Sequence, residues 1–144
     1  MDHEDSCTFE KAHELWRTGD LDGFLALCHD DITWTVNMDG IAVPYVSSAF
    51  GKEDLRWRLI HLGTVFEIRS FDVTSIVYGP EFCSSRAKIL YVHRVVGEPL
   101  QTVLLFKGWF RDGRLVRIEE SVDRNYVEAY DRLMKYLAQS KNIQ

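Results

Sequence analysis

Apolar residues at helical spacing predict two helices at the start of the chain. The first helix is predicted over residues 8–18 and ends at Gly19, a residue that commonly terminates helices. Its inner positions are Phe9, Ala12, His13 and Trp16. A second helix is predicted to follow at once, capped by Asp20 and ending near residues 29–31.

The pattern then changes from helical spacing to alternation. Ile32, Trp34 and Val36 alternate with polar residues, which predicts a half-buried strand. Residues 39–51 contain glycine, proline and serine and predict a loop. Residues 52–62 carry a stripe of leucines and predict a third helix.

From Val65 onward the chain has the pattern of successive antiparallel strands. The first runs to the turn at Gly79-Pro80, and the others are predicted at residues 82–96, 100–111 and 115–122. The inward face switches near Ser70, which predicts a bulge or bend. Asp112-Gly113 is a tight-hairpin signal, and Asp123 is predicted to cap a final helix.

Helices followed by a run of antiparallel strands are typical of the α+β class. We therefore predict a cone-shaped α+β barrel, in which the N-terminal helices pack on a curved, mainly antiparallel sheet. The mouth of such a cone is the expected ligand site, because the sheet's own side chains cannot fill it.

Length and charge narrow the class of protein further. The 144 residues are predicted to form a single domain, with flexible ends at residues 1–7 and 139–144. A net charge of -5 argues against nucleic acid and against anionic membranes as partners. The acidic start is unlike a secretion signal, and the apolar runs are far shorter than the roughly 20 residues of a membrane span. We expect a cytoplasmic protein.

The sequence shows no pattern typical of a metal or nucleotide site. Cys7, Cys28 and Cys83 are widely spaced and are predicted to be reduced thiols that fill the core. The five histidines form no H-x-H or H-E-x-x-H pattern. A phosphate-binding glycine loop and a G-x-S-x-G elbow are also missing. We therefore expect no metal and no cofactor.

Glu120 is the acidic member of an otherwise apolar row on the last predicted strand, and the row consists of Val116, Ile118, Glu120 and Val122. Burying an ionised carboxylate costs several kcal/mol, so its pKa should rise toward the range of a general acid or base. The alternative is a solvated or backbone-bonded Glu120 at the rim. His93 is predicted to face inward and to act as its proton partner, and the alternative for it is a satisfied core histidine.

Aromatic and aliphatic side chains are predicted to line the cone, although such residues also form ordinary cores. The candidate ligand contacts are Trp16, Trp34, Val36, Tyr45, Phe50, Leu59, Tyr91, Phe106, Phe110 and Ile118. Tyr45 or Tyr91 is the candidate hydrogen-bond donor to developing oxyanion charge. Val103, Leu105 and Trp109 are predicted to face outward, and this outer sheet face predicts a homodimer.

Several stretches of the sequence resemble one superfamily. The opening, with Trp16-Arg17-Thr18-Gly19-Asp20 and later Ile32-Thr33-Trp34, resembles the start of SnoaL-like and ketosteroid-isomerase-like proteins of the nuclear transport factor two-like superfamily. Gly51-Lys52-Glu53 and the ending at residues 112–123 fit the same family. The resemblance implies a cone-shaped barrel, commonly dimeric, with a hydrophobic pocket. It also implies diverse activities: isomerases, polyketide cyclases, dehydratases, epoxide hydrolases and non-catalytic binders.

The resemblance argues against true ketosteroid isomerase activity. It places Ala12, Val36 and Phe106 where that enzyme has its oxyanion-binding tyrosine, its base and its acidic donor. Glu120 is similar in position to acidic residues that SnoaL-like cyclases and epoxide hydrolases use for proton transfer.

Two functions from different classes follow. The first is an enzyme, an isomerase or polyketide-cyclase-like lyase, that binds a small hydrophobic ligand and moves a proton on it with Glu120 and His93. The second is a non-catalytic module for ligand binding or dimerisation. The inward carboxylate favours the first, and the missing isomerase residues favour the second.

Overall fold

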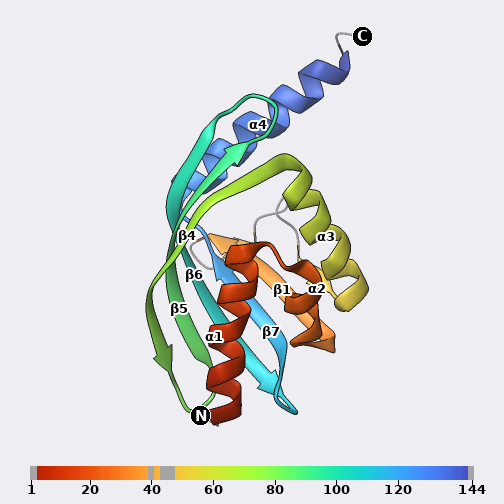
Figure 1. The fold of residues 1–144 in the computed structure, drawn as a ribbon. Helices are drawn as coiled ribbons and strands as arrows, with labels where there is room; N and C mark the ends of the chain where they lie inside the picture. The colour runs from red at the N-terminus through yellow and green to blue at the C-terminus, as the bar shows by residue number, and fades with distance from the viewer. Residues whose placement is uncertain (1–2, 39–40, 43–47, 143–144) are drawn as a thin grey trace.

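A computed structural model describes residues 3–38, 41–42 and 48–142 (Figure 1). Along the chain they form α1 (His3–Thr18), α2 (Leu21–Ala26), β1 (Cys28–Met38), β2 (Ile41–Ala42), β3 (Ala49–Phe50), α3 (Lys52–Val65), β4 (Phe66–Tyr78), β5 (Cys83–His93), β6 (Pro99–Arg111), β7 (Arg114–Ser121) and α4 (Arg124–Asn142).

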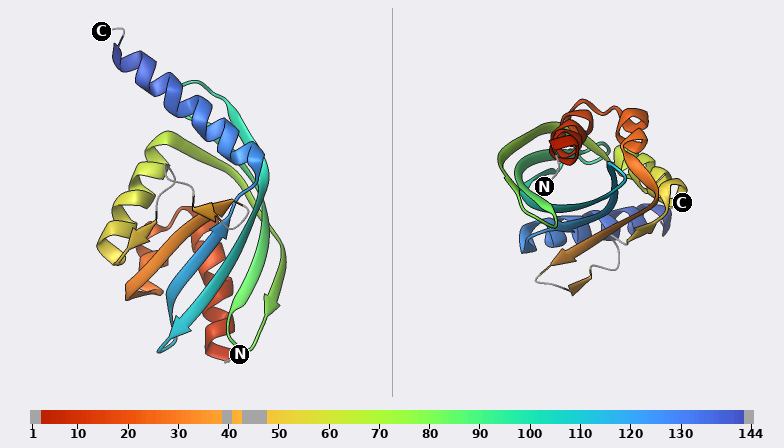
Figure 2. Two further views of the ribbon diagram at one scale, coloured as in Figure 1. Left: turned by 180° about the vertical axis from the view of Figure 1, so that it is seen from behind. Right: turned by 90° about the horizontal axis from the view of Figure 1, so that it is seen from below.

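The strands form one curved sheet in the order β2-β1-β7-β6-β5-β4, with β3 paired to β1. All neighbouring strands are antiparallel except β1 and β7, which run parallel. Figure 2 shows the sheet curving around α1, with α2 and α3 closing the open side. The predicted α+β cone with a mainly antiparallel sheet is confirmed.

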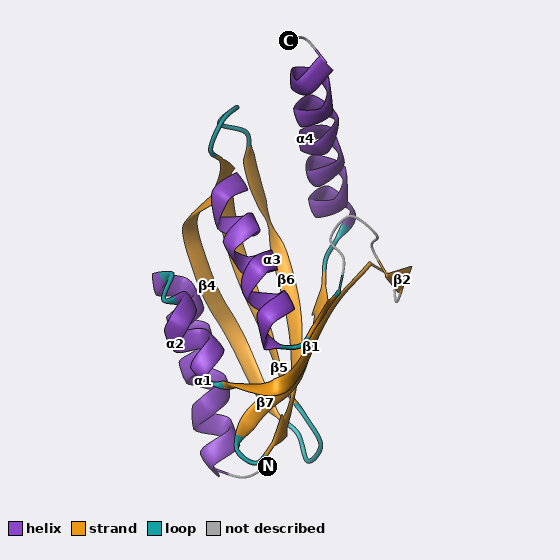
Figure 3. Ribbon diagram, turned by 90° about the vertical axis from the view of Figure 1, so that its right-hand side faces the viewer, coloured by secondary structure: helices purple, strands orange, loops and turns teal. Residues whose placement is uncertain are grey.

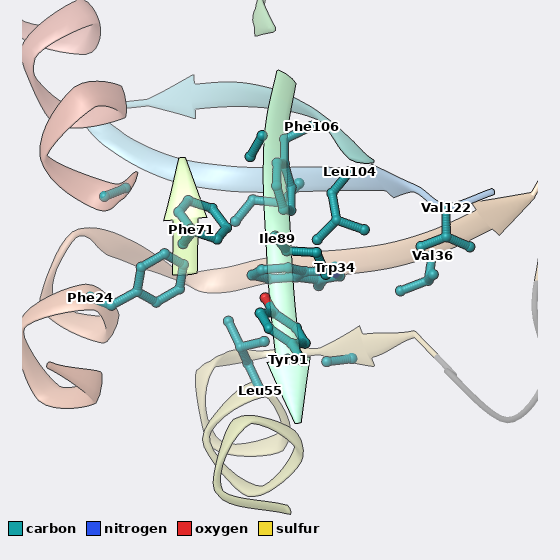
Figure 4. Packing of buried hydrophobic residues seen from close by; sticks show 14 of the residues in the cluster. Phe24, Trp34, Val36, Leu55, Phe71, Ile89, Tyr91, Leu104, Phe106 and Val122 are labelled. Carbon is teal, nitrogen blue, oxygen red and sulfur yellow. The ribbon is translucent and has the colours of Figure 1, made fainter. Parts of the chain in front are cut away.

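Helix α1 packs inside the curve of the sheet, where its apolar side lies against Gly108 of β6, a residue without a side chain. Phe9 and Ala12 are buried on this side. A Cβ atom built on Gly108 of β6 would lie 2.8 Å from Cε1 of Phe9, so only a glycine lets the helix approach this closely. The core continues along the sheet through Leu104, Phe106 and Ile89, as Figure 4 shows.

The strand faces agree with the sequence pattern except where the register shifts. The predicted irregularity near Ser70 is confirmed, because the pairing of β4 with β5 shifts between Ile68 and Ser70. Another of the register shifts in the sheet lies between Trp109 and Phe110, opposite Val116 of β7. The prediction that Val116 shares the inner face is therefore wrong, and Leu115 is buried in its place.

The helix boundaries differ from the prediction at four places, and one of them is the end of α3, which lies at Val65 and not at Leu62. Helix α2 ends at Ala26, because the amide of Leu115 donates to the carbonyl of Leu27 over 3.0 Å and Cys28 already pairs with β7. Sheet pairing thus replaces the predicted last turn of the helix. Residues 3–7 and 139–142 belong to α1 and α4, so the helices extend into segments that the sequence pattern left outside them.

The predicted caps and hairpin turn are confirmed. Oδ1 of Asp20 accepts from the amide of Gly23 over 2.9 Å, and Oδ1 of Asp123 accepts from the amide of Tyr126 over 2.9 Å. Asp112 and Gly113 both have positive φ, 54° and 75°, as a tight hairpin turn of this type requires.

Helix α4 contacts β6, and its C-terminal end projects beyond the sheet (Figure 1). Tyr126, Ala129 and Leu133 form its buried side. Within the described residues, every helix is too short or too polar to cross a membrane.

Candidate functional site

The main pocket lies between α3 and the concave side of the sheet and has a volume of about 370 Å³. Its inner wall is formed by Trp16, Trp34 and Tyr91, and the apolar side of α3 closes it with Leu55 and Leu59. Figure 4 shows Tyr91 and Leu55 together at this wall, below Trp34. The volume is within the range of small-molecule sites, which are mostly apolar with a few polar groups.

Glu120 is the acidic group on the sheet side of this pocket. Its side chain is buried, and Oε2 accepts a hydrogen bond from Nε1 of Trp34 over 3.3 Å. Burial raises the pKa of Glu120 from 4.5 to about 7, and the hydrogen bond from Trp34 opposes that rise. Both the acid and the carboxylate are therefore populated near neutral pH, as proton transfer in either direction requires.

Glu120 lies between the two positions that the resemblance assigns to carboxylates in ketosteroid isomerase. Its Cα partner on β1 is Val36, and its Cα partner on β6 is Phe106. The carboxylate of this chain therefore lies on β7, between Val36 of β1 and Phe106 of β6, which are both apolar.

Tyr91 supplies a buried hydroxyl to the same pocket. Its oxygen accepts from Nε1 of Trp16 over 3.3 Å, so the hydroxyl hydrogen remains the donor of this group. Burial raises the pKa of Tyr91, the negative charge of Glu120 raises it further, and the hydrogen bond from Trp16 lowers it. The hydroxyl therefore stays protonated at neutral pH and can donate a hydrogen bond.

The structure brings together part of the predicted ligand contacts. Trp16, Trp34, Val36, Leu59 and Tyr91 line the main pocket together with Glu120. Phe106 and Ile118 line a deeper hollow of about 30 Å³ toward α1, which shares Trp16 and Trp34 with the main pocket.

The remaining predicted contacts lie elsewhere. Phe110 packs against Phe9 with ring centroids 6.2 Å apart and lines neither of these two hollows. Phe50 is 68% exposed, because β3 turns this side chain away from the sheet. Tyr45 lies outside the described residues.

His93 is buried but does not line the pocket. Its Nδ1 accepts from the amides of Val95 and Val96 over 3.2 and 3.0 Å, and its ring packs edge-on against Phe66. The expected pairing of His93 with Glu120 is not formed. Its geometry matches the alternative, a core histidine satisfied by the turn that follows it.

Sequence reasoning missed the polar rim that α3 contributes. Asp54, Trp57, Arg58 and His61 line the pocket at its mouth, and Trp57 is 66% exposed there. Nε of Arg58 lies 3.6 Å from Oδ1 of Asp54. The four residues are spaced i, i+3, i+4 and i+7 within the predicted helix, and this spacing could have indicated from the sequence that they share one face. Tyr126 of α4 completes the lining.

A second polar pair, the half-buried His13 and the buried Ser85, connects α1 with β5. Nδ1 of His13 is 2.6 Å from the carbonyl oxygen of Phe9, and Nε2 is 2.7 Å from Oγ of Ser85. A carbonyl can only accept, so Nδ1 carries the hydrogen and Nε2 accepts from the serine hydroxyl. Burial lowers the pKa of His13. The described residues contain no cluster of side chains that could hold a metal ion.

The sequence was compared with models of protein families and with curated protein sequences. A family model described as a SnoaL-like domain matches residues 9–118. No curated protein sequence matches the chain.

Solved structures of low sequence identity share the fold. An NTF2-like protein of unknown function from Burkholderia pseudomallei is 21% identical, with a TM-score of 0.73 over 85% of this chain and 92% of that one. A proposed isomerase from Rhodopseudomonas palustris is 15% identical, with a TM-score of 0.70 over 89% and 96% of the two chains. IdmH, a proposed polyketide cyclase from Streptomyces antibioticus, is 19% identical, with a TM-score of 0.64 over 82% and 91%.

Proposed function

The chain belongs to the SnoaL-like domain family, and on this premise we propose that it binds a small, mostly apolar molecule in the main pocket and moves a proton on it with Glu120. The observation that supports this proposal is the buried carboxyl group of Glu120, whose pKa is raised to about 7 within an aromatic pocket. Similar solved structures include a proposed isomerase and a proposed polyketide cyclase, which is compatible with such chemistry.

The proposed step is abstraction of a proton from carbon next to a carbonyl group. The carboxylate of Glu120 takes the proton, the C–H electron pair forms the enolate double bond, and the carbonyl oxygen gains the negative charge. The hydroxyl of Tyr91 is the candidate donor to that oxygen, because its own hydrogen is available. Protonated Glu120 then returns the proton to a second carbon, which gives isomerisation. Alternatively, the enolate attacks a second carbonyl group and protonated Glu120 gives its proton to the resulting alkoxide, which gives aldol-type cyclisation.

The experiment compares Glu120→Gln with Glu119→Gln. Glu119 is the neighbouring residue, half-buried on the other face of β7 and hydrogen-bonded to Arg117 over 2.7 Å, so its substitution is the matched control. On a panel of enones, β-keto esters and epoxides, Glu120→Gln is expected to lower kcat at least a hundredfold, and Glu119→Gln is expected to leave kcat unchanged. Full turnover by Glu120→Gln would contradict the proposal.

A non-catalytic binding module is the second candidate. Ala12, Val36 and Phe106 are apolar at positions where the resemblance would place isomerase chemistry, and this favours binding without turnover. Binding of panel members without turnover of any would support this second function.

The outer sheet face supports a further part of the proposal, a homodimer. Leu105 is 45% exposed on this face. Four residues further along β6, the ring centroid of Trp109 lies 5.1 Å from that of Phe82, and the guanidinium of Arg117 lies 4.4 Å from the ring of Trp109. Such a face, apolar with flanking cations, suits a second copy of this chain.

A further inference from the structure

A second hollow, the side hollow, lies on the opposite side of α3 from the mouth of the main pocket. It has a volume of about 330 Å³ and is bounded by the end of α1, α2, α3 and the start of β4. Figure 3 looks onto α3, with α1 and α2 on one side of it and β1 and α4 on the other. The main pocket and the side hollow thus open on the two sides of one helix.

The main pocket and the side hollow adjoin each other and share four lining residues. Trp16, Leu59, Leu62 and Tyr91 line both of them. The hydrogen bond from Nε1 of Trp16 to the hydroxyl of Tyr91 is 3.3 Å long, at the weak end of the usual range. A ligand that occupies both hollows has to displace these shared side chains, and three of them, Trp16, Leu59 and Leu62, are only partly buried.

Most charged groups of the side hollow already have partners. Arg17 forms an ion pair with Glu14, and Glu67 forms one with Arg69 over 3.2 Å. Oδ1 of Asp20 caps α2. Arg94 is the remaining cation of this hollow. Among the described residues, no Asp or Glu forms an ion pair with it.

Arg94 is held in place at the edge of the side hollow. Its Nε donates to the carbonyl of Gly63 over 2.7 Å, and its amide donates to the carbonyl of Val65 over 2.9 Å. The turn that carries Arg94 is fixed in addition by His93, whose Nδ1 accepts from the amides of Val95 and Val96. The guanidinium is thereby oriented in advance, which suits recognition of a carboxylate or another planar anion.

We propose that the main pocket and the side hollow form one elongated site, whose ligand has an apolar body beside Glu120 and a carboxylate that Arg94 binds. This inference rests on the proposed function and adds the class of substrate, an amphiphilic carboxylic acid. Arg94 lies three residues beyond Tyr91 along the chain, which corresponds to roughly 10 Å in extended backbone. The ligand therefore needs a chain of this length between its ring and its acid group.

The experiment measures binding of three probes to the full chain by isothermal titration calorimetry. The probes are 2-naphthol, 6-(2-naphthyloxy)hexanoic acid and the N-methylamide of that acid. In the wild type, the acid is expected to bind about tenfold more tightly than the amide, since one charge-assisted contact has this effect. Arg94→Gln is expected to remove the difference, and Arg94→Lys is expected to keep part of it.

Arg86→Gln is the matched control, because Arg86 is exposed on β5 and lines neither hollow. It is expected to leave the preference for the acid unchanged. Equal affinity for acid and amide in the wild type, or a preference that survives in Arg94→Gln, would overturn the inference. If one of these results is found and 2-naphthol still binds, the inference fails and the proposed function stands. If 2-naphthol does not bind, the ligand class of the proposed function is itself wrong.

Discussion

Nε1 of Trp34 donates a hydrogen bond to Oε2 of Glu120 over 3.3 Å, between the parallel strands β1 and β7. This contact holds the carboxyl group against the wall of the main pocket. It also stabilises the ionised form and so limits how far burial raises the pKa of Glu120.

The first prediction concerns this indole. Trp34→Phe removes the donor and keeps an aromatic ring, so the pKa of Glu120 is expected to rise above its wild-type value of about 7. NMR titration of the Glu120 carboxyl carbon measures the change. Trp16→Phe is the control, because the indole of Trp16 donates to Tyr91 instead. An unchanged or lower pKa in Trp34→Phe would contradict the role assigned to the hydrogen bond.

The second prediction is a loss of stability with rising pH. The pKa of Glu120 is about 7 in the folded protein against 4.5 for an ordinary glutamate, so the folded state retains a proton that the unfolded state releases between these values. The free energy of unfolding should therefore fall by up to about 3 kcal/mol from pH 4.5 to pH 7 through this group. Urea unfolding of Glu120→Gln across this range should show the decline removed; an identical pH dependence would refute it.

The third prediction has the opposite sign and concerns His13. Burial lowers its pKa below 6.5, so above pH 6.5 the imidazole is neutral in both states and its effect on stability is constant. As the pH falls from 6.5 toward the folded pKa, the unfolded state gains a proton first and the protein loses stability. His13→Gln should lose less stability than the wild type over this interval in urea unfolding. A steeper loss in the variant would count against it.

The fourth prediction tests how α1 reaches the sheet. Gly108→Ala places a methyl group 2.8 Å from the ring of Phe9 and is expected to lower the free energy of unfolding by about 1–3 kcal/mol. Phe9→Leu removes the ring that the methyl group meets. The double variant should therefore be more stable than the sum of the two single changes predicts, which a double-mutant cycle measures. Additive effects would show that the two residues do not interfere.

The fifth prediction concerns the proposed dimer. Trp109→Glu places a charge on the outer sheet face and is expected to give a monomer by multi-angle light scattering, where the wild type gives a dimer. Val95→Glu is the control, since Val95 is 70% exposed in the turn after β5. A monomeric wild type, or a dimeric Trp109→Glu, would disprove this interface.

The sequence by itself determined the order of the helices and of the long strands, but not the short strands β2 and β3, and it determined the inward direction of Glu120. These follow from local rules: alternation places Ile118, Glu120 and Val122 on one face, and Asp20 and Asp123 cap helices through amides three residues away. Such rules act within a few residues and can be recognised in the chain alone.

Only the tertiary structure decided which of these side chains meet. His93 faces inward as alternation predicts, yet the turn after β5 binds its ring nitrogen, and His61 of α3 lies at the pocket in its place. Val116 is only half-buried and Leu115 takes the buried position, because β6 and β7 shift register beside them. Strand register, sheet curvature and the position of α3 depend on packing between residues far apart in the sequence, so local periodicity does not contain them.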